Sequence, residues 1–506
     1  MFLELFSSLE SILIIALIIT PIISGVLVTF LKKKKIIELV TVFSSFLILI
    51  EGLILVNSIL KYKTISVFDG IFYVDSLSGI IIITISLVGF LSSIYSVSYM
   101  GKQYEKLIID EKKLVRYYQG FNMFLFTMLL VPISNNMGIM WIAIEATTLV
   151  SVLLIMLYVK QSSIEASWKY LLIATVGLSL ALFGTIFFYY VNIVDVPLEE
   201  EDVLGMNWTN LVENASGFDP NLVKLAFIFI IVGFGTKAGL APMHTWLPDA
   251  HSEAPSPISA LLSGVLLNCA FYGILRFHII TSNSIGSHFS NTLLIILGVV
   301  SIGIAAASIY FQKDLKRMLA FSSVEHMGII SVAIGFGSVI GIFGALLHII
   351  NHAVVKSLLF FTSGSISQKY ETKLISDTSG IIRIMPITGF AFLIGVLAII
   401  GLPPFNIFMS EFLVLSSGFE SENFLPSMLV ILFLVIIFAG FGKHLLKMVF
   451  GNPKQTIKKG DLGILSIIPM LILISIIFVM GTYVPEPLQT LIGDASQILL
   501  VGDLHN

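Results

Sequence analysis

Apolar segments of about 20 residues recur along this chain, and their repetition constrains the fold more than any other feature. A helix of that length spans the hydrocarbon core of a bilayer and satisfies its own backbone hydrogen bonds there. The composition agrees, with 57% hydrophobic and 12% charged residues among 506. The sequence therefore predicts an all-α polytopic membrane protein. We expect about fourteen transmembrane helices, at residues 9–31, 36–57, 77–100, 118–134, 137–159, 166–191, 222–240, 257–279, 291–311, 318–336, 338–362, 383–402, 424–447 and 463–484.

The basic residues are distributed unevenly between the connections. Of 28 Lys and Arg, 22 fall in one alternating set of connections, beginning with Lys32 to Lys35, and only four fall in the other set. Cytoplasmic loops are enriched in Lys and Arg, so the pattern predicts that the N-terminus lies outside. The remaining two, Lys237 and Lys356, lie inside apolar segments.

The stretch from Gly235 to Pro257 interrupts an apolar segment with a lysine, prolines and several ionisable residues. Lys237 follows about fifteen nearly uninterrupted apolar residues, and Pro242 then breaks the helical ladder. A charged group beside a helix break at membrane depth predicts a functional site. The Gly401–Pro404 stretch repeats the pattern, because it also ends an apolar helix, adjoins a further helical piece and has an ionisable residue nearby. Two such breaks are typical of inverted repeats.

Glu145 lies in the middle of the fifth predicted helix. An unpaired carboxylate there would cost several kcal/mol, so we expect it to be protonated or paired with Lys237. A static ion pair that fixes helix packing is the alternative to an ion path.

The eleventh predicted helix carries His348, His352 and Lys356 at four-residue spacing, which aligns them on one face. Histidine titrates near neutral pH and desolvation favours neutral lysine, so the row can accept and release protons. A metal site at the two histidines is disfavoured, because the metalloprotease glutamate is missing from the intervening residues.

Two further segments carry candidate residues. Glu325 and His326 are adjacent and should point about 100° apart, so we expect His326 to join the proton path and Glu325 to be a partner or packing group. Glu411, after the second helix break, suits the end of such a path.

The loop after the first break contains His244, Asp249, His251 and Glu253, and we expect it to shape an ion entrance or the contact between two helices. Nothing elsewhere supplies a nucleophile with its base, so no catalytic residue is predicted. Cys269 is the single cysteine, which excludes an iron-sulfur cluster held by this chain alone. Without a phosphate loop, dinucleotide fingerprint or haem motif, we expect no cofactor and no metal in this chain and no nucleic-acid partner.

These residues resemble those of the antiporter-like proton-channel subunits of respiratory complex I, Mrp-type antiporters and energy-converting hydrogenases. Three segments, Trp141–Ser151, Gly235–Pro257 and Ser322–Gly328, look most like component F of the formate-hydrogenlyase or hydrogenase-four type. The resemblance implies two inverted five-helix repeats with the seventh and twelfth helices broken. It divides the chain into helices 1–3 (1–116), a first repeat (117–280), a second repeat (290–450) and helix 14 (451–506).

The resemblance also implies roles for the candidate residues. Glu145 and Lys237 match an acid and a base whose pairing switches as a proton passes. His326, His348 and His352 match positions in the central axis, and Lys356 matches a lysine that only some members carry. Glu411 matches the terminal residue of the twelfth helix. Asn268 stands where many members have a lysine, and asparagine cannot take up a proton at neutral pH.

The leading hypothesis is a proton-translocating subunit of a redox-driven complex in the cell inner membrane. Its expected partners are other antiporter-like and small membrane subunits, with peripheral iron-sulfur and nickel-iron or NADH-oxidising subunits. One alternative is a subunit of a multi-subunit Na⁺/H⁺ antiporter, which the absence of redox partners would distinguish. The other is a non-conducting membrane anchor, which Asn268 favours and full coupling in a Glu145→Gln variant would support.

Overall fold

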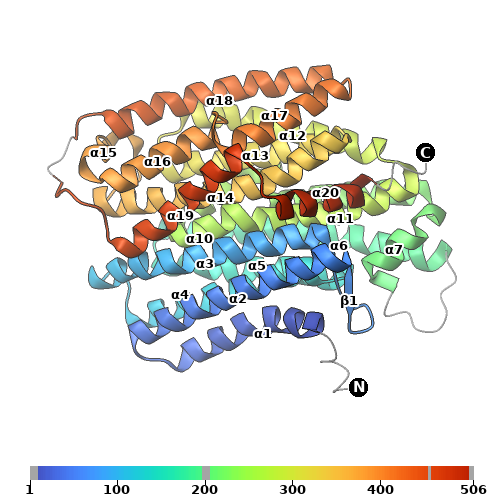
Figure 1. The fold of residues 1–506 in the computed structure, drawn as a ribbon, viewed down its shortest axis with the longest axis horizontal. Helices are drawn as coiled ribbons and strands as arrows, with labels where there is room; N and C mark the ends of the chain where they lie inside the picture. Colours follow the sequence, from blue (N-terminus) through green and yellow to red (C-terminus); the bar gives the residue numbers. More distant parts are fainter. Residues whose placement is uncertain (1–8, 196–204, 454–456, 501–506) are drawn as a thin grey trace.

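The computed structural model describes residues 9–195, 205–453 and 457–500, which form a bundle of long helices. The helices run side by side along the longest axis, with α1 at one edge of the view and α18 at the other (Figure 1). All fourteen predicted segments are helical over most of their length, as α1 (Leu9–Phe30), α2 (Lys34–Tyr62), α3 (Ser76–Glu105), α4 (Glu111–Ile133), α5 (Met137–Ile155), α6 (Gln161–Asp195), α8 (Pro220–Ala238), α10 (Ser256–Leu261) with α11 (Leu267–Ile285), α12 (His288–Phe311), α13 (Leu315–Gly335), α14 (Val339–Tyr370), α15 (Ile381–Ile384) with α16 (Pro386–Ile399), α18 (Phe424–Phe450) and α19 (Ile464–Thr482).

Some elements were not predicted from the sequence. An antiparallel hairpin of β1 (Ile65–Val67) and β2 (Phe72–Val74) connects α2 to α3, with Ile65 opposite Val74. The helices α7 (Trp208–Asn214) and α20 (Glu486–Leu500) were also missed, because neither has a long apolar run. The pieces expected beside the two breaks are α9 (Leu247–Glu253) and α17 (Asn406–Glu420).

Twelve helical stretches of the described residues are long and apolar enough to cross a membrane. Two predicted spans are not among them: α4 begins with a charged turn, and α16 has only 14 residues before the chain breaks. Both nevertheless pack inside the bundle, α4 against α1 and α5, and α16 against α14. The protein is an all-α polytopic membrane protein, as predicted.

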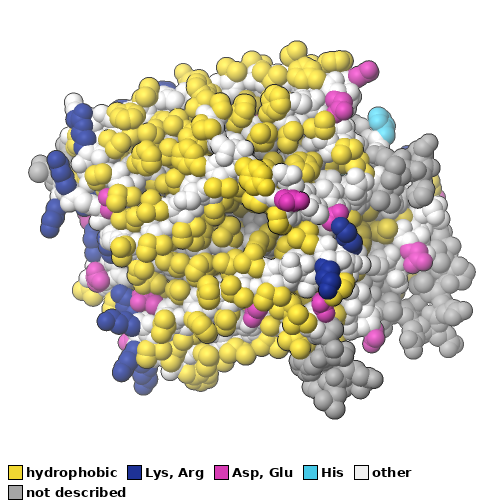
Figure 2. Space-filling view, in the orientation of Figure 1, with side chains coloured by type: hydrophobic (Ala, Val, Ile, Leu, Met, Phe, Trp, Pro, Cys, Tyr) yellow, Lys and Arg dark blue, Asp and Glu magenta, His cyan; other side chains and the backbone are white. Residues whose placement is uncertain are grey.

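Side-chain types are segregated along the bundle axis. Figure 2 shows a broad apolar surface along the helices, and most of the visible Lys and Arg lie at one end. Figure 1 places the connection between α1 and α2 at this same end. We call it the basic end. The position of the N-terminus relative to the membrane stays a prediction.

A buried ion pair between α3 and α11 stabilises the opposite end of the bundle. Asp75 caps α3 and accepts two hydrogen bonds of 2.7 Å from the Arg276 guanidinium on α11. The guanidinium also lies 4.3 Å from the centre of the Trp208 ring on α7. Because the pair is bidentate and stacked on an aromatic ring, both charges are compensated although both side chains are buried.

Glycine ends the helix at each of the two breaks. Gly239 follows α8 with φ +78°, and Gly401 follows α16 with φ +69°, a conformation that glycine adopts at little cost. A Cβ at Gly239 would lie 2.5 Å from Leu247 Cδ1, whereas a Cβ at Gly401 would lie 2.0 Å from Glu411 Oε2. The second break therefore holds its backbone directly against a carboxylate.

Candidate functional site

Lys237 lies fully buried in the last turn of α8, surrounded by hydroxyl groups. Its ammonium donates a 2.7 Å hydrogen bond to Thr148 Oγ1 on α5 and another to the Tyr170 hydroxyl on α6. The Nζ atom also lies 4.6 Å from the centre of the Tyr170 ring. Two oxygens and an aromatic face thus replace part of the water that a charged ammonium requires.

Glu145 is near Lys237, but the two do not form a direct ion pair. The Glu145 carboxylate is half-buried and accepts a 3.1 Å hydrogen bond from Thr175 Oγ1 on α6. The described residues show no Glu145–Lys237 contact within 4.0 Å, although the two charges interact and Thr148 interacts with both. Hydroxyls therefore separate the acid from the base. The expectation that Glu145 is either protonated or paired with Lys237 stays a prediction.

The predicted row on α14 is buried and faces α13 and α17. His348 Nε2 lies 2.9 Å from His326 Nδ1, and His348 Nδ1 lies 2.9 Å from Ser410 Oγ on α17. The centre of the His352 ring lies 5.3 Å from that of the His326 ring, with the two ring planes tilted by 41°. In the His326–His348 contact one nitrogen must carry the proton and the other accept it, so a proton can pass between the rings.

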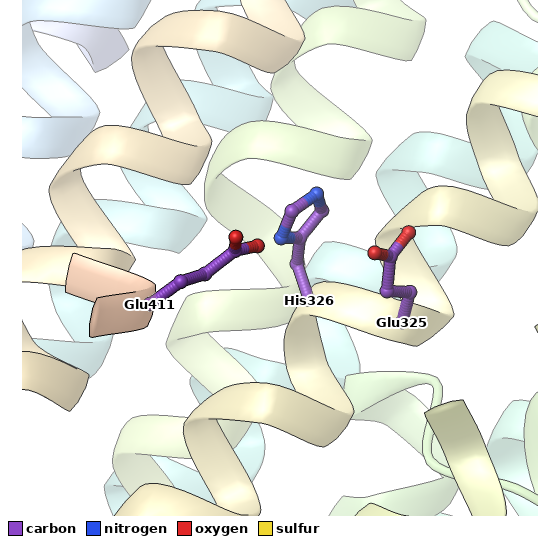
Figure 3. Close-up of side chains that lie close together, drawn as sticks. All are labelled: Glu325, His326 and Glu411. Carbon is purple, nitrogen blue, oxygen red and sulfur yellow. The ribbon is translucent and has the colours of Figure 1, made fainter. Parts of the chain in front are cut away.

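Glu325, His326 and Glu411 converge although the sequence suggested otherwise (Figure 3). A carboxylate oxygen from each glutamate and a ring nitrogen of His326 all lie within 4.8 Å of one another. The two neighbouring residues were expected to point about 100° apart, yet the ends of their side chains lie close together. The role of Glu325 as a partner or packing group stays a prediction. Glu411, which was expected at the end of the path, is one of these three residues. We call His326, His348, His352, Glu325 and Glu411 the central cluster.

The central cluster holds many polar atoms without a partner among the described residues. These are both oxygens of Glu325, both nitrogens of His352, Nε2 of His326 and Oε1 of Glu411. Buried polar groups are normally hydrogen-bonded, and where protein atoms do not supply the partner, ordered water usually does. The atoms are therefore placed to hold water between the titratable side chains.

Lys356, one turn beyond His352 on α14, points toward α13. Its ammonium donates a 2.6 Å hydrogen bond to the Leu319 carbonyl and another to Ser322 Oγ. The next residue, Ser323, is 2.7 Å from Ser263 on the segment that leads into α11. Hydroxyl groups thus extend the row of buried polar side chains from Lys356 toward the first half of the chain. We call this row the polar line.

Asn268 lies where that segment changes its geometry. Residues Leu262–Leu266 form a π-helical turn between α10 and α11, a feature that often accompanies functional sites. The Asn268 amide donates to the Gly264 carbonyl at 2.8 Å, and its Oδ1 has no partner among the described residues. The side chain is therefore suited to hold water, which a proton path without a lysine at this position requires.

The four residues of the loop after the first break do not form one group. Asp249 pairs with Arg317, and Glu253 pairs with Lys373 at 3.1 Å, both toward the basic end.

The two histidines of this loop are buried. His251 is fully buried and interacts electrostatically with Lys356 and with the buried Lys316. The buried His244 packs against the ring of Phe321. Of the four, His251 is the one placed between the basic end and Lys356.

The donor set of Glu325, His326 and Glu411 can also ligate a cation. Two carboxylates and one imidazole suit zinc and related divalent metals. The expectation that the chain binds no metal stays a prediction.

Comparisons with known proteins agree with this geometry. Residues 134–438 match the NADH:quinone oxidoreductase/Mrp antiporter transmembrane family. The chain belongs to this family. A hydrogenase-4 component F homolog of Methylacidiphilum infernorum (isolate V4) is 43% identical over 419 residues, 82% of this chain and 86% of that protein. The family resemblance seen in the sequence is thereby confirmed, and the protein is an antiporter-like subunit of the kind found in respiratory membrane complexes.

Other relatives match less of their own length or show the fold alone. Hydrogenase-4 component B of Escherichia coli (strain K12) is 31% identical over 68% of this chain, but the chain spans only 50% of that protein. The membrane-bound sulfane sulfur reductase, an archaeal respiratory membrane complex, contains a chain that matches 97% of this one with a TM-score of 0.86. At 24% identity that likeness establishes the fold and no more.

Several polar residues of the site were missed in the sequence. Tyr170, Thr148, Ser263, Ser410 and Thr175 each contribute a hydroxyl to the contacts above. Thr148, Ser322 and Ser323 lie in the segments Trp141–Ser151 and Ser322–Gly328 singled out above, but none of them received a role. The available signal was the presence of hydroxyl residues within apolar helices, and it does not distinguish inward-facing residues from the many that bond their own helix.

Proposed function

We propose that this subunit moves protons along a buried polar line from the basic end to the central cluster, as part of a redox-driven complex. The observation that carries this proposal is the number of buried titratable groups that lie within hydrogen-bond reach of one another or of hydroxyls. Charged and titratable residues inside a membrane protein are costly and mostly mark ion paths. The electron-transfer chemistry would reside on iron-sulfur and nickel-iron or NADH-oxidising partner subunits.

The proposed mechanism depends on the spacing between Glu145 and Lys237. The Lys237 ammonium donates hydrogen bonds to Thr148 and Tyr170, so a small movement of α5 or α6 changes how well its charge is compensated. Charges several ångströms apart interact by kilocalories at an effective dielectric of about 20. Separating Glu145 from Lys237 would therefore favour release of the lysine proton.

The released proton would continue through Lys356 and the central cluster. Ser263, Ser323 and Ser322 provide hydroxyls on the way to Lys356. Beyond it, the two histidine rings in contact and the carboxyls of Glu325 and Glu411 can each hold a proton in turn. His251 provides a route by which protons from the basic end reach Lys356. With that end toward the cytoplasm, the N-terminus lies outside in the cell inner membrane.

The test is the Lys237→Met variant in the purified complex. In proteoliposomes with an imposed potassium diffusion potential and an internal pH dye, we expect proton uptake to fall about tenfold or more, which about 1.4 kcal/mol on the barrier would produce. The matched control is Lys224→Met, which removes an exposed lysine from the same helix. Unimpaired uptake in Lys237→Met, with the complex assembled, would reject the proposal.

A second candidate function is Na⁺/H⁺ exchange. It is favoured by the proximity of the Glu325 and Glu411 carboxylates, since hard cations prefer oxygen ligands. Uptake of ²²Na⁺ driven by a pH gradient, lost in Glu325→Gln, would establish exchange. Proton uptake that is independent of Na⁺ would exclude it.

A further inference from the structure

A large cavity opens at the basic end, outside the central cluster. Its volume is about 720 Å³, in the range of ligand sites in proteins. It is lined by the last turns of α3 and α14, the first turn of α13 and the end of α9. Because helix ends meet here, the cavity lies at the level where a membrane helix leaves the hydrocarbon core and reaches the lipid headgroups.

The cavity lining has an excess of positive charge. It contains seven lysines but only two carboxylates, Glu253 and Glu371. Glu253 is paired with Lys373 at 3.1 Å, and Glu371 with Lys106 at 2.5 Å. The hydrogen bond from the Lys106 ammonium lowers the pKa of the exposed Glu371 carboxyl.

Five lysines of the lining have no ion pair among the described residues. They are Lys102, Lys160, Lys316, Lys369 and Lys458. Lys316 is 2% exposed, and its ammonium donates to the Ala254 carbonyl at 2.6 Å. Several ammonium groups around one space repel each other unless an anion occupies it.

Polar atoms of α14 complete the lining. Within the described part of the chain, Ser367 Oγ and Gln368 Oε1 are buried and have no hydrogen-bond partner. The Gln368 amide is held by a 3.0 Å hydrogen bond from Nε2 to the Tyr99 carbonyl, so the oxygen keeps a fixed position. A serine hydroxyl can donate to a phosphate oxygen, and the amide oxygen can accept from a headgroup hydroxyl.

Apolar side chains flank the cavity. Leu107, between the lining residues Lys106 and Ile108, is 88% exposed, and Val159, between Tyr158 and Lys160, is 61% exposed. Exposed leucine and valine beside a cluster of lysines match a ligand that is charged at one end and apolar at the other. A free phosphate would leave these side chains uncovered.

We propose that this cavity binds the phosphate headgroup of an anionic phospholipid, with the acyl chains passing over Leu107 and Val159. Basic pockets between transmembrane helices at the cytoplasmic face are typical sites for such headgroups. The inference is independent of proton conduction, because Lys102 and Lys160 have no part in the proposed path. A bound lipid would hold the ends of α3 and α14 together.

The experiment compares two double variants of the full chain. Lys102→Gln with Lys160→Gln removes two unpaired lysines of the cavity, and Lys112→Gln with Lys313→Gln removes two exposed lysines that do not line it. Each protein is titrated in neutral detergent with phosphatidylglycerol, and separately with inorganic phosphate. Bound mass is read by native mass spectrometry, and the thermal midpoint of each variant confirms folding.

We expect one phosphatidylglycerol to bind the wild type and the control with equal affinity, and the cavity variant to bind it about tenfold or more weakly. Equal lipid affinity in all three proteins would overturn the proposal. Binding of inorganic phosphate without phosphatidylglycerol binding would also overturn it, because it assigns the cavity to a free anion.

Discussion

The surroundings of Lys237 and the central cluster are both buried and polar, but they satisfy their polar groups differently. Lys237 is held by two hydroxyls and an aromatic face that belong to neighbouring helices. The central cluster instead leaves six carboxylate oxygens and imidazole nitrogens without a partner among the described residues. The first region is arranged to control the charge of a single group, whereas the second is arranged to hold water among many.

The two helix breaks show the same contrast. The break after α8 packs Gly239 against the apolar Leu247, and the break after α16 packs Gly401 against the Glu411 carboxylate. A switch benefits from a dry, fixed environment, because desolvation strengthens the interaction between charges. A relay needs side chains that can exchange protons with water.

The sharpest test of this contrast exchanges each break glycine for alanine. Both variants should lose about 1–2 kcal/mol of stability, because both glycines have a left-handed φ. Gly401→Ala should also reduce proton uptake about tenfold or more, since the new Cβ displaces the Glu411 carboxylate and small misplacements are costly in proton transfer. Gly239→Ala, whose new Cβ meets only the apolar side chains of Leu247 and Leu267, is the control. Equal loss of uptake in both variants would contradict the assignment of Glu411.

The fold could be predicted from the sequence because apolar length alone determines where helices cross a membrane. All fourteen segments were identified, and the break at Pro242 was visible as a proline and glycine cluster. The hairpin before α3 and the helix α20 were missed, because short amphipathic or polar elements have no comparable signal. The inverted relation of the two repeats stays a prediction.

The candidate site could be predicted only in part. Ionisable residues such as Lys237 and His348 are conspicuous in apolar helices. Their importance follows from the free-energy cost of burying an ionisable group in a membrane. Tyr170 and Ser410 are not conspicuous, since burying a hydroxyl group in a membrane helix costs little free energy and many hydroxyls bond their own backbone. The approach of Glu325 to His326 could not be predicted, because helical geometry fixes the Cβ direction but not where a long side chain ends.

A second test weakens the surroundings of Lys237 without removing the lysine. Tyr170→Phe deletes one hydrogen-bond acceptor of the ammonium and keeps the ring. Loss of a hydrogen bond to a charged group costs about 1.5–3 kcal/mol, so we expect proton uptake to fall about tenfold. Tyr190→Phe, at an exposed position of the same helix, is the control. If both variants conduct equally, the Tyr170 hydroxyl does not control the lysine proton.

The smallest effect is expected within the central cluster, where water can replace a lost partner. Ser410→Ala removes the hydroxyl that lies 2.9 Å from His348 Nδ1. The same hydroxyl also accepts a 3.2 Å hydrogen bond from the Asn351 amide. A water molecule in the space left by the hydroxyl can bond the same nitrogen, so proton uptake should fall by about twofold or less. Ser417→Ala, about two turns further along α17, removes a hydroxyl that bonds only its own helix and provides the control. A loss as large as that of Tyr170→Phe would show that the central cluster depends on fixed protein contacts rather than water, and the contrast between the two regions would disappear.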